Sequence, residues 1–140
     1  ISEAMMKIHQ YTMLCAPVLS QEAAVEALRH DDECRDMRES YARRRNLIVQ
    51  ALAEMDLPVC RPQGAFYAFP SIAHCGLSSK DFALRLLDDQ NVACVPGTAF
   101  GACGEGFLRC SYATDIDEIK EAMRRMAIFV KRFKRRRAAR

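Results

Sequence analysis

A connection rich in glycine joins two short apolar stretches in the second half of the sequence. The stretches are residues 92–95 and 107–112, and the segment between them contains a Pro-Gly pair and four of the six glycines. Glycine permits tight turns and close approach between backbone segments. The pattern therefore predicts two short strands joined by a turning loop, and with them a fold that contains a small sheet.

An arginine interrupts the second of these apolar stretches. Side chains alternate between the two faces of a strand, so Arg109 would share one face with Phe107 and Ser111. The opposite face would then carry Leu108, Cys110 and Tyr112. A guanidinium that loses water among apolar neighbours needs an acceptor for its fork of donors. Either a carboxylate of this protein or a ligand supplies that acceptor.

Helical periodicity accounts for most of the remaining sequence. Apolar residues spaced three and four apart predict helices over residues 1–11, 17–29, 33–55, 78–90 and 116–133. Extended segments are predicted on either side of Pro62–Gly64, with Ala65–Phe69 the stronger strand, and over Val92–Val95. The order of elements predicts an α+β fold with a small mixed or antiparallel sheet of three to four strands. Helices would cover one face of this sheet, and a long helix would lie at the domain edge.

Polar residues mark where three of these helices begin. Ser78 with Asp81, and Thr114 with Asp117, have the spacing of capping boxes, and Asp31 and Asp32 precede the long helix. The long helix has an apolar stripe whose members are Met37, Tyr41, Ile48, Leu52 and Met55. The run of three arginines at positions 43–45 is predicted to form its solvated face.

Cysteine and histidine placement argues against a metal site. The seven cysteines are odd in number, irregularly spaced and without a C-x-x-C pair, which is typical of reduced thiols in a cytoplasmic protein. His9, His30 and His74 lack the spacing of zinc ligands. No apolar run approaches membrane-spanning length, so we predict no metal site and no membrane partner.

Positive charge is concentrated at the end of the sequence. The last ten residues hold seven of the 21 lysines and arginines and no acid, which leaves 14 basic against 18 acidic residues elsewhere, a net charge of −4. The rest of the chain is mildly acidic and shows no interleaved basic and aromatic residues, so we predict no nucleic-acid partner. We interpret the basic tail as a solvated helix end whose positive charge suits the helix C-terminus.

Common catalytic patterns are missing from this sequence. The glycine-rich segment lacks the G-K-[ST] ending of a phosphate loop and leads into a strand rather than a helix. Lys80 follows a serine in the first turn of a capped helix and is expected to be a surface residue rather than a Schiff-base lysine. The sequence begins at Ile1 in a helical pattern already under way, which we interpret as the C-terminal part of something larger.

Three motifs in order carry a family resemblance. They are RPQGAFYAFP at 61–70, VACVPGTAFG at 92–101 and GEGFLRCSYA at 104–113. Together they resemble the C-terminal small domain of class I/II aminotransferases, pyridoxal-phosphate enzymes of the aspartate aminotransferase fold type. The resemblance extends over residues 5–133. It implies a junction segment at 1–30, the small domain at 31–133 and a basic tail at 134–140.

The resemblance also implies roles for individual residues. Arg109 matches the family arginine that grips the α-carboxylate of the substrate, and Phe66 matches a residue that approaches the substrate side chain. Tyr11 and Thr12 lie where the family segment reaches the active site of the neighbouring subunit. The Schiff-base lysine would lie upstream of Ile1, since none of the five lysines here matches it.

The expected parent protein is thus a cytoplasmic homodimer that uses pyridoxal phosphate to move an amino group from an amino acid to a 2-oxo acid. This chain would supply the carboxylate clamp and would be inactive alone. A carbon–sulfur lyase of the same fold would use the same clamp. An interaction module with a basic tail is an alternative from another class.

Overall fold

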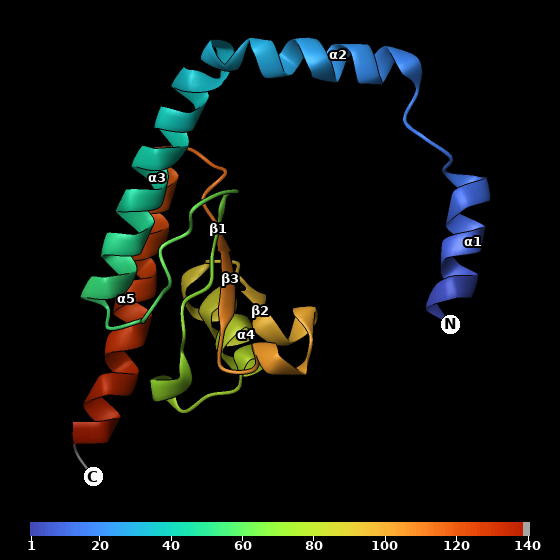
Figure 1. Cartoon of the computed structure of the whole chain (residues 1–140). Coiled ribbons are helices and arrows are strands. Elements are labelled where there is room, and N and C mark those ends of the chain that lie inside the picture. The colour runs from blue at the N-terminus through green and yellow to red at the C-terminus, as the bar shows by residue number, and fades with distance from the viewer. Residues whose placement is uncertain (139–140) are drawn as a thin grey trace. The chain divides into compact units, whose positions relative to one another are not determined.

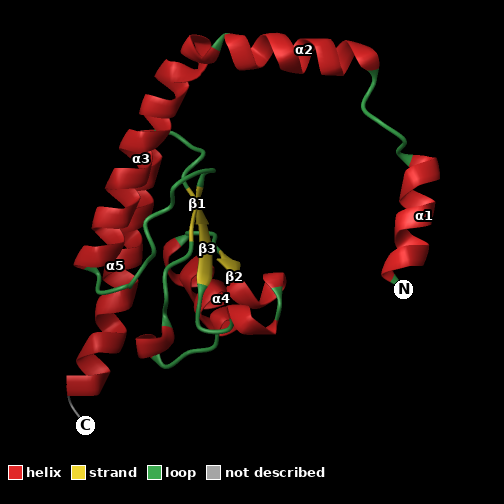
Figure 2. Cartoon of the chain, viewed as in Figure 1, coloured by secondary structure: helices red, strands yellow, loops and turns green. Residues whose placement is uncertain are grey.

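Five α-helices and one small sheet make up the regular backbone of the described residues (Figures 1 and 2). The computed structural model describes residues 1–138, with the side chains of all but residues 31, 33 and 134–138. The chain divides into two compact units, Ile1–Met37 and Arg38–Arg140. The α+β prediction is confirmed, whereas the domain boundaries predicted at residues 30 and 133 stay predictions.

The first unit consists of helical segments. Helix α1 spans Ser2–Thr12, α2 spans Val18–Arg29 directly after Pro17, and the 3₁₀ turn η1 spans Asp31–Cys34. Neither α-helix buries a residue. Their exposed large apolar side chains are Met5, Met6, Ile8, Tyr11, Val18, Leu19, Val25 and Leu28. The two helices were therefore predicted correctly, but the apolar residues on which the prediction rested are not buried.

Helix α3, Arg35–Glu54, leads into the second unit. Ile48 and Leu52 from its predicted stripe are fully buried and Met55, just after the helix, is nearly so, whereas Met37 is exposed. The prediction of a solvated face at 43–45 is wrong for Arg44, which is partly buried beside the Tyr41 ring, and for Arg45, which is also partly buried. Its Nη1 donates to the carbonyl of Pro62 at 3.4 Å, because the chain after α3 returns along this side of the helix.

Three short strands form an antiparallel sheet in the order β1-β3-β2. Strand β1 is Tyr67–Ala68, β2 is Val95–Pro96 and β3 is Leu108–Ser111. Tyr67 lies opposite Ser111, and Val95 lies opposite Arg109. Both outer strands are shorter than the sequence predicted, and β2 begins at the last residue of the predicted 92–95 strand.

The hydrophobic core lies against one face of this sheet. Leu108, Cys110 and Tyr112 point into it, as the alternation along β3 predicted. Helices α4, Ser79–Gln90, and α5, Ile116–Ala138, cover this face together with α3. The helical contribution consists of Ile48, Leu52, Phe82, Ala83, Leu86, Ile119, Met123, Met126, Phe129 and Val130. The Phe82 and Phe129 rings meet edge to face, with their centroids 5.0 Å apart.

The predicted capping boxes have different outcomes. The Ser78 hydroxyl accepts from the backbone N–H of Asp81 at 3.1 Å and donates to its carboxylate at 2.8 Å, so this cap is confirmed. At the start of α5 the cap is Asp115, whose Oδ1 accepts from the N–H of Asp117 at 2.8 Å. The prediction of Thr114 is therefore wrong by one residue, because Ile116 is the first helical position.

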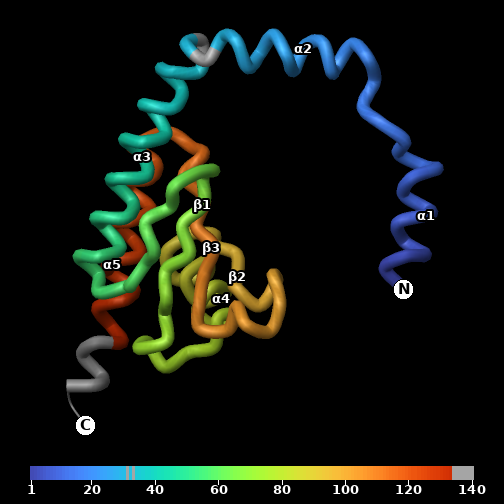
Figure 3. The backbone as a smooth tube through the Cα atoms, in the orientation of Figure 1, coloured from blue at the N-terminus to red at the C-terminus, as the bar shows by residue number. Residues whose placement is uncertain are grey.

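The glycine-rich connection packs on itself and on the start of α4. It contains the 3₁₀ turns η3, Gly97–Phe100, and η4, Ala102–Gly104, and Figure 3 traces it in orange. The fully buried Ser79 anchors it, because the Ser79 hydroxyl accepts from the N–H of Gly106 at 2.8 Å. The carboxylate of Glu105 accepts from the Ser79 N–H at 2.8 Å. These contacts fix the loop that follows β2 against the helical layer.

Gly97 and Gly104 allow the closest backbone approach in this loop. A Cβ built on Gly97 would lie 2.1 Å from the carbonyl oxygen of Gly104, which no side chain movement relieves because both atoms belong to backbone. We expect Gly97→Ala to lower the free energy of unfolding by at least about 1–3 kcal/mol, the usual effect of overpacking. Urea unfolding followed by circular dichroism measures this change.

The matched control is Gly64→Ala. A Cβ at Gly64 would meet nothing within 4 Å. This variant should therefore unfold within about 0.5 kcal/mol of the unmodified chain, as surface substitutions usually do. Equal stability of the two alanine variants would contradict the packing described for the glycine-rich connection.

Candidate functional site

Arg109 lies on the central strand, on the sheet face opposite the core. Its neighbours Leu108 and Cys110 are buried, whereas the Arg109 side chain is half-buried on the face that the helices leave uncovered. Because β3 pairs with β1 on one side and β2 on the other, the backbone of Arg109 is held between two strands. The alternation of a buried strand thus places a single cation at a defined point outside the core.

Two aromatic rings lie against the guanidinium of Arg109. Its Cζ atom is 4.4 Å from the ring centroid of Tyr67 and 4.7 Å from that of Phe100. Tyr67 comes from β1, and Phe100 comes from η3 after β2, so the two rings reach Arg109 from the two flanking elements. Contacts of this kind stabilise the cation and restrict its rotamers without using its N–H donors.

The N–H donors of Arg109 have no acceptor in the described part of the chain. Within those residues neither an ion pair nor a hydrogen bond involves this guanidinium, although seven other ion pairs are present. Of the two alternatives that the sequence left open, an internal carboxylate is therefore not found among the described side chains. The arrangement is suited to an external anion that reaches the donors edge-on.

The second predicted residue, Phe66, lies one ring away from Arg109. The Phe66 ring centroid is 4.5 Å from that of Tyr67, the same ring that contacts the guanidinium. Phe69 extends the aromatic cluster on the other side, 5.7 Å from the ring centroid of Phe100. All of these phenylalanines are more than one-third exposed, so the cluster forms an apolar surface around one cation.

Tyr11 and Thr12, the other predicted site residues, lie on α1 in the first unit. The Tyr11 side chain is exposed, and the Thr12 hydroxyl donates to the carbonyl of Ile8 one turn earlier. The hydrogen bond of Thr12 is therefore a local helical contact within the first unit. Their role near a cofactor stays a prediction.

The two rings that contact the candidate cation, Tyr67 and Phe100, were not predicted from the sequence. Tyr67 could have been found from register, because it shares a sheet face with Ser111 and hence with Arg109. Phe100 had no such signal, since its position depends on the path of the glycine-rich connection. Their identification completes a site built from one cation and surrounding aromatic side chains.

Arg45 is a second partly buried cation in this unit. Its Nε is buried and has no hydrogen-bond partner among the described atoms. Burial raises the pKa of Tyr112, and the charge of Arg45 partly opposes this change. The Tyr112 hydroxyl donates to the carbonyl of Ala65 at 3.1 Å, which ties the end of β3 to the segment before β1. We assign Arg45 to this structural arrangement, since a loop carbonyl already occupies its Nη1.

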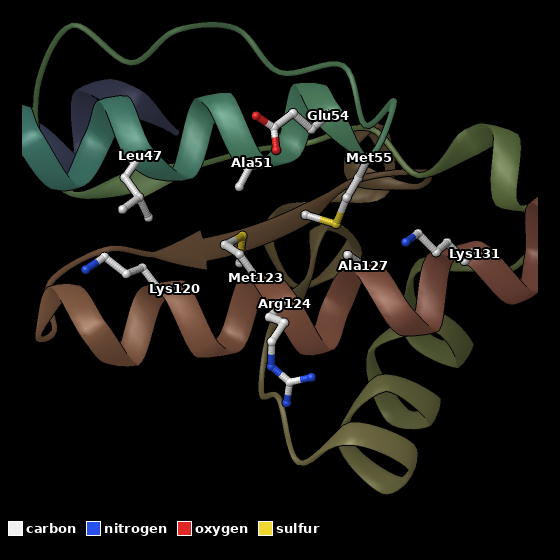
Figure 4. A pocket seen from close by; sticks show the side chains of 9 residues that line it. All are labelled: Leu47, Ala51, Glu54, Met55, Lys120, Met123, Arg124, Ala127 and Lys131. Carbon is white, nitrogen blue, oxygen red and sulfur yellow. The ribbon is translucent and has the colours of Figure 1, made fainter.

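An open groove of about 400 Å³ separates α3 from α5 (Figure 4). Leu47, Ala51, Met55, Met123 and Ala127 form its apolar floor, with Glu54, Lys120, Arg124 and Lys131 at its rim. The rim cations Lys120 and Arg124 are paired with acids on their own helix. The lining of this groove does not include Arg109 or its aromatic neighbours, so the groove and the candidate cation site are separate.

Comparison with known proteins identifies the family. The family model "Aminotransferase class I and II" matches residues 1–126, which is most of the chain. The chain belongs to this family. The class I and II aminotransferases use pyridoxal phosphate, so the predicted family and its cofactor are confirmed.

Individual relatives give the extent of the match. The chain is 51% identical over 131 residues to the Bacillus subtilis protein YugH, covering 93% of this chain and 34% of that protein. It is 46% identical over 129 residues to the aspartate aminotransferase of Pyrococcus abyssi, covering 90% and 33%. The crystal structure of an aromatic aminotransferase from Pyrococcus horikoshii has a TM-score of 0.77 at 44% identity, covering 94% and 36%. The chain thus spans about a third of the length of these aminotransferases.

The lysines of this chain do not fit covalent attachment of pyridoxal phosphate. A lysine that forms a Schiff base needs a desolvated or cationic environment that lowers its pKa. Lys7, Lys80, Lys120 and Lys131 are exposed, and Lys120 pairs with Asp117 at 2.6 Å. Lys134 lies outside the described side chains. No described lysine therefore provides a site for the cofactor of this family.

Two further features of the described residues concern metals and membranes. Among the side chains that the structure describes, three or more His, Cys, Asp or Glu residues nowhere converge to hold a metal ion. No helix between residues 1 and 138 combines the length and apolar character needed to cross a bilayer. The charge of the predicted basic tail, residues 134–140, falls on side chains outside the described set.

We expect the 140-residue chain alone to form no specific adduct with pyridoxal phosphate. Its exposed lysines, such as Lys80 and Lys131, should react slowly and without preference, because nothing around them activates an amine. Borohydride reduction followed by peptide mass mapping measures the distribution of the label. Stoichiometric labelling of a single lysine would contradict the assignment of all described lysines to the surface.

A pH-dependent prediction concerns the ion pairs of α5. Hydrogen bonds from Arg124 and Arg125 lower the pKa of Glu121 to about 2. Because the folded pKa is the lower one, the stabilising effect is complete above the ordinary pKa near 4.5 and disappears as the pH falls through about 2. Carbon-13 NMR titration of the Glu121 carboxyl group measures this pKa.

Removing the donors should raise the pKa of Glu121. We expect Arg124→Met and Arg125→Met each to move it toward 4.5, and the double variant to move it further. The control is Arg132→Met, which removes the ion pair with Asp89 and leaves Glu121 with both donors. An unchanged pKa in the Arg124/Arg125 double variant would show that these hydrogen bonds are not its cause.

Proposed function

We propose that this chain is the part of an aminotransferase in which Arg109 binds the α-carboxylate of the substrate. The whole protein would move an amino group from an amino acid to a 2-oxo acid, with pyridoxal phosphate held by residues outside this chain. The observation that carries the proposal is the Arg109 guanidinium, which rests on two rings and has no acceptor among the described residues. The family match supplies the chemical context.

The geometry around Arg109 supports recognition of a carboxylate in particular. A guanidinium presents paired N–H donors in one plane, and a carboxylate accepts two of them in parallel. The contacts of Tyr67 and Phe100 lower the local water content and limit the rotamers of the cation. A charge-assisted pair is stronger in such a setting than on an open surface. Both an amino acid and a 2-oxo acid carry the group that this site would bind.

The surrounding phenylalanines suit the part of the substrate beyond the carboxylate. Phe66 contacts the ring of Tyr67 and Phe69 contacts the ring of Phe100, so each lies next to a ring that rests on Arg109, and each is partly exposed. An apolar surface beside a single cation would orient a substrate by its one charged end and contact the remainder. The named relatives include aspartate and aromatic-amino-acid enzymes, so the proposal remains at the class of amino acids.

The parent protein is further proposed to be a cytoplasmic homodimer. The expectation rests on the family resemblance and on the cysteine pattern, and Tyr11 and Thr12 would face the partner subunit's active site. A carbon–sulfur lyase and an interaction module are less favoured, because the family model and the named relatives are aminotransferases.

The test is Arg109→Leu in the full-length aminotransferase that contains this chain. Loss of a bidentate charge-assisted contact should lower kcat/KM for amino and oxo acids. The expected loss of transition-state stabilisation is about 2–5 kcal/mol. We expect KM to rise and kcat to fall, because the carboxylate contact also orients the reacting group. Steady-state kinetics with both substrate classes measures these changes.

Two controls make this test specific. Arg85→Leu removes an exposed arginine on α4 and should leave kcat/KM unchanged. An amine substrate that lacks the α-carboxylate should react equally slowly with the unmodified enzyme and with Arg109→Leu. The assignment is wrong if Arg109→Leu keeps kcat/KM within about threefold, which corresponds to about 0.65 kcal/mol.

A further inference from the structure

Two cysteine sulfurs lie close together across the sheet. The Sγ atoms of Cys94 and Cys110 are 3.6 Å apart and share a hydrogen bond. Cys110 is on the central strand β3 and points into the core, and Cys94 directly precedes β2. Neither residue takes part in the Arg109 cluster.

The strand register explains why the two thiols face each other. Val95 lies opposite Arg109, so continuing the antiparallel register by one residue places Cys94 opposite Cys110. Leu108 and Tyr112 direct their N–H groups to carbonyls on the β1 side, at 3.1 and 2.9 Å. Cys110 has the same orientation, which makes Cys94–Cys110 a non-hydrogen-bonded pair between β2 and β3.

This type of pair has the dimensions of a disulfide. Directly opposed residues at non-hydrogen-bonded positions have Cα atoms about 4.5 Å apart, and disulfides span about 4.4–6.8 Å between Cα atoms. The sulfurs need to approach by about 1.5 Å to reach the bonding distance of about 2.05 Å. Rotation of the Cys94 side chain, which is only partly buried, can supply this movement.

A small cleft connects the two sulfurs with the surface. It has a volume of about 70 Å³, and both Cys94 and Cys110 line it, with Thr114, Glu118 and Ala122 farther along its wall. This volume is several times the roughly 10–15 Å³ that one water needs by such a measure, so the cleft has room for a small molecule such as hydrogen peroxide. A small oxidant can therefore reach the cleft that both sulfurs line.

The two thiols also differ in acidity. The hydrogen bond with Cys110 lowers the pKa of Cys94, although burial opposes this effect. The same hydrogen bond and burial raise the pKa of Cys110 well above its usual value. Cys94 is thus the thiol that ionises first, with the Cys110 S–H as the donor to its thiolate.

We propose that Cys94 and Cys110 form a redox modification site at which a hydroperoxide converts the two thiols into a reversible disulfide. The site is independent of the function proposed for Arg109. It would respond to hydrogen peroxide or to a small alkyl hydroperoxide.

The chemistry balances in two steps. The Cys94 thiolate attacks one peroxide oxygen, the O–O bond breaks, and the released hydroxide takes up a proton to leave as water. The Cys110 sulfur then attacks the resulting Cys94 sulfenic acid, and its S–H proton leaves with the displaced hydroxide as a second water. In total the two thiols lose two electrons and two protons, and one hydrogen peroxide is reduced to two waters; with an alkyl hydroperoxide the first step releases an alcohol in place of a water.

The disulfide would join β2 covalently to the strand that carries Arg109. It would close the chain over residues 94–110, which include the whole glycine-rich connection and Phe100. Such a bond restricts the separation of β2 from β3 and so limits movement of the ring that rests on Arg109. Reduction by a dithiol would restore the open form.

The test uses the full 140-residue chain with its four exposed cysteines, Cys15, Cys34, Cys60 and Cys103, changed to serine. This background keeps Cys75, Cys94 and Cys110. After treatment with hydrogen peroxide, remaining thiols are alkylated under denaturing conditions and the chain is digested without reductant. We expect a linked peptide pair that joins Cys94 to Cys110, a single alkylated thiol at Cys75, and full reversal by dithiothreitol.

Single variants in the same background separate the two roles. Cys110→Ala should allow a sulfenic acid to accumulate at Cys94, where dimedone traps it. Cys94→Ser should slow peroxide-dependent loss of thiol at position 110 by at least about tenfold, because the remaining thiol is buried and burial alone still raises its pKa. Cys75→Ser is the matched control and should form the Cys94–Cys110 bond at an unchanged rate. Circular dichroism checks that each variant is folded.

Three results would overturn the proposal. The first is a linked peptide pair that contains Cys75 in place of Cys94 or Cys110. The second is oxidation of Cys94 to sulfinic acid while Cys110 stays reduced. The third is thiol loss in the Cys94→Ser variant at the same rate as in the background chain.

Discussion

The alternation of side chains along β3 separates the hydrophobic core of the second unit from its candidate site. Leu108, Cys110 and Tyr112 enter the core on one side, and Arg109 leaves it on the other. Because β3 is the central strand, hydrogen bonds from both neighbours fix its register. A shift of one residue would bury the cation and expose the core side chains, so the fold and the site depend on the same pairing.

Packing of the glycine-rich connection extends this constraint beyond the strands. Gly97 meets Gly104 backbone to backbone, and Ser79 links the same loop to the start of α4. Phe100 is carried on this loop, and its ring completes the surroundings of Arg109. The position of one site residue therefore depends on contacts made in the helical layer, several residues away from the site itself.

Local patterns made the helices, the capping box at Ser78 and the two faces of β3 predictable, because each depends on residues close in sequence. Arg45 was misassigned because its burial depends on the segment around Pro62, which returns along the helix and is distant in sequence. A local signal was present, since the spacing of Arg45 from Tyr41 and Ile48 places it beside the apolar stripe. The proximity of Cys94 and Cys110 follows from strand register, which the sequence alone did not specify. The family motifs identified Arg109 as a candidate, but they gave no indication of the rings that hold it.

The rings beside Arg109 have a geometric consequence for any anion that binds there. Contacts of Tyr67 and Phe100 with the flat guanidinium leave its edge as the route by which two oxygens can accept hydrogen bonds. A carboxylate bound in this way becomes coplanar with the guanidinium, and its bond to the next carbon points directly away from Arg109. Two atoms of the ligand would then determine the direction in which the rest of the molecule extends. The orientation of one side chain on a four-residue strand would therefore set the orientation of the whole bound ligand.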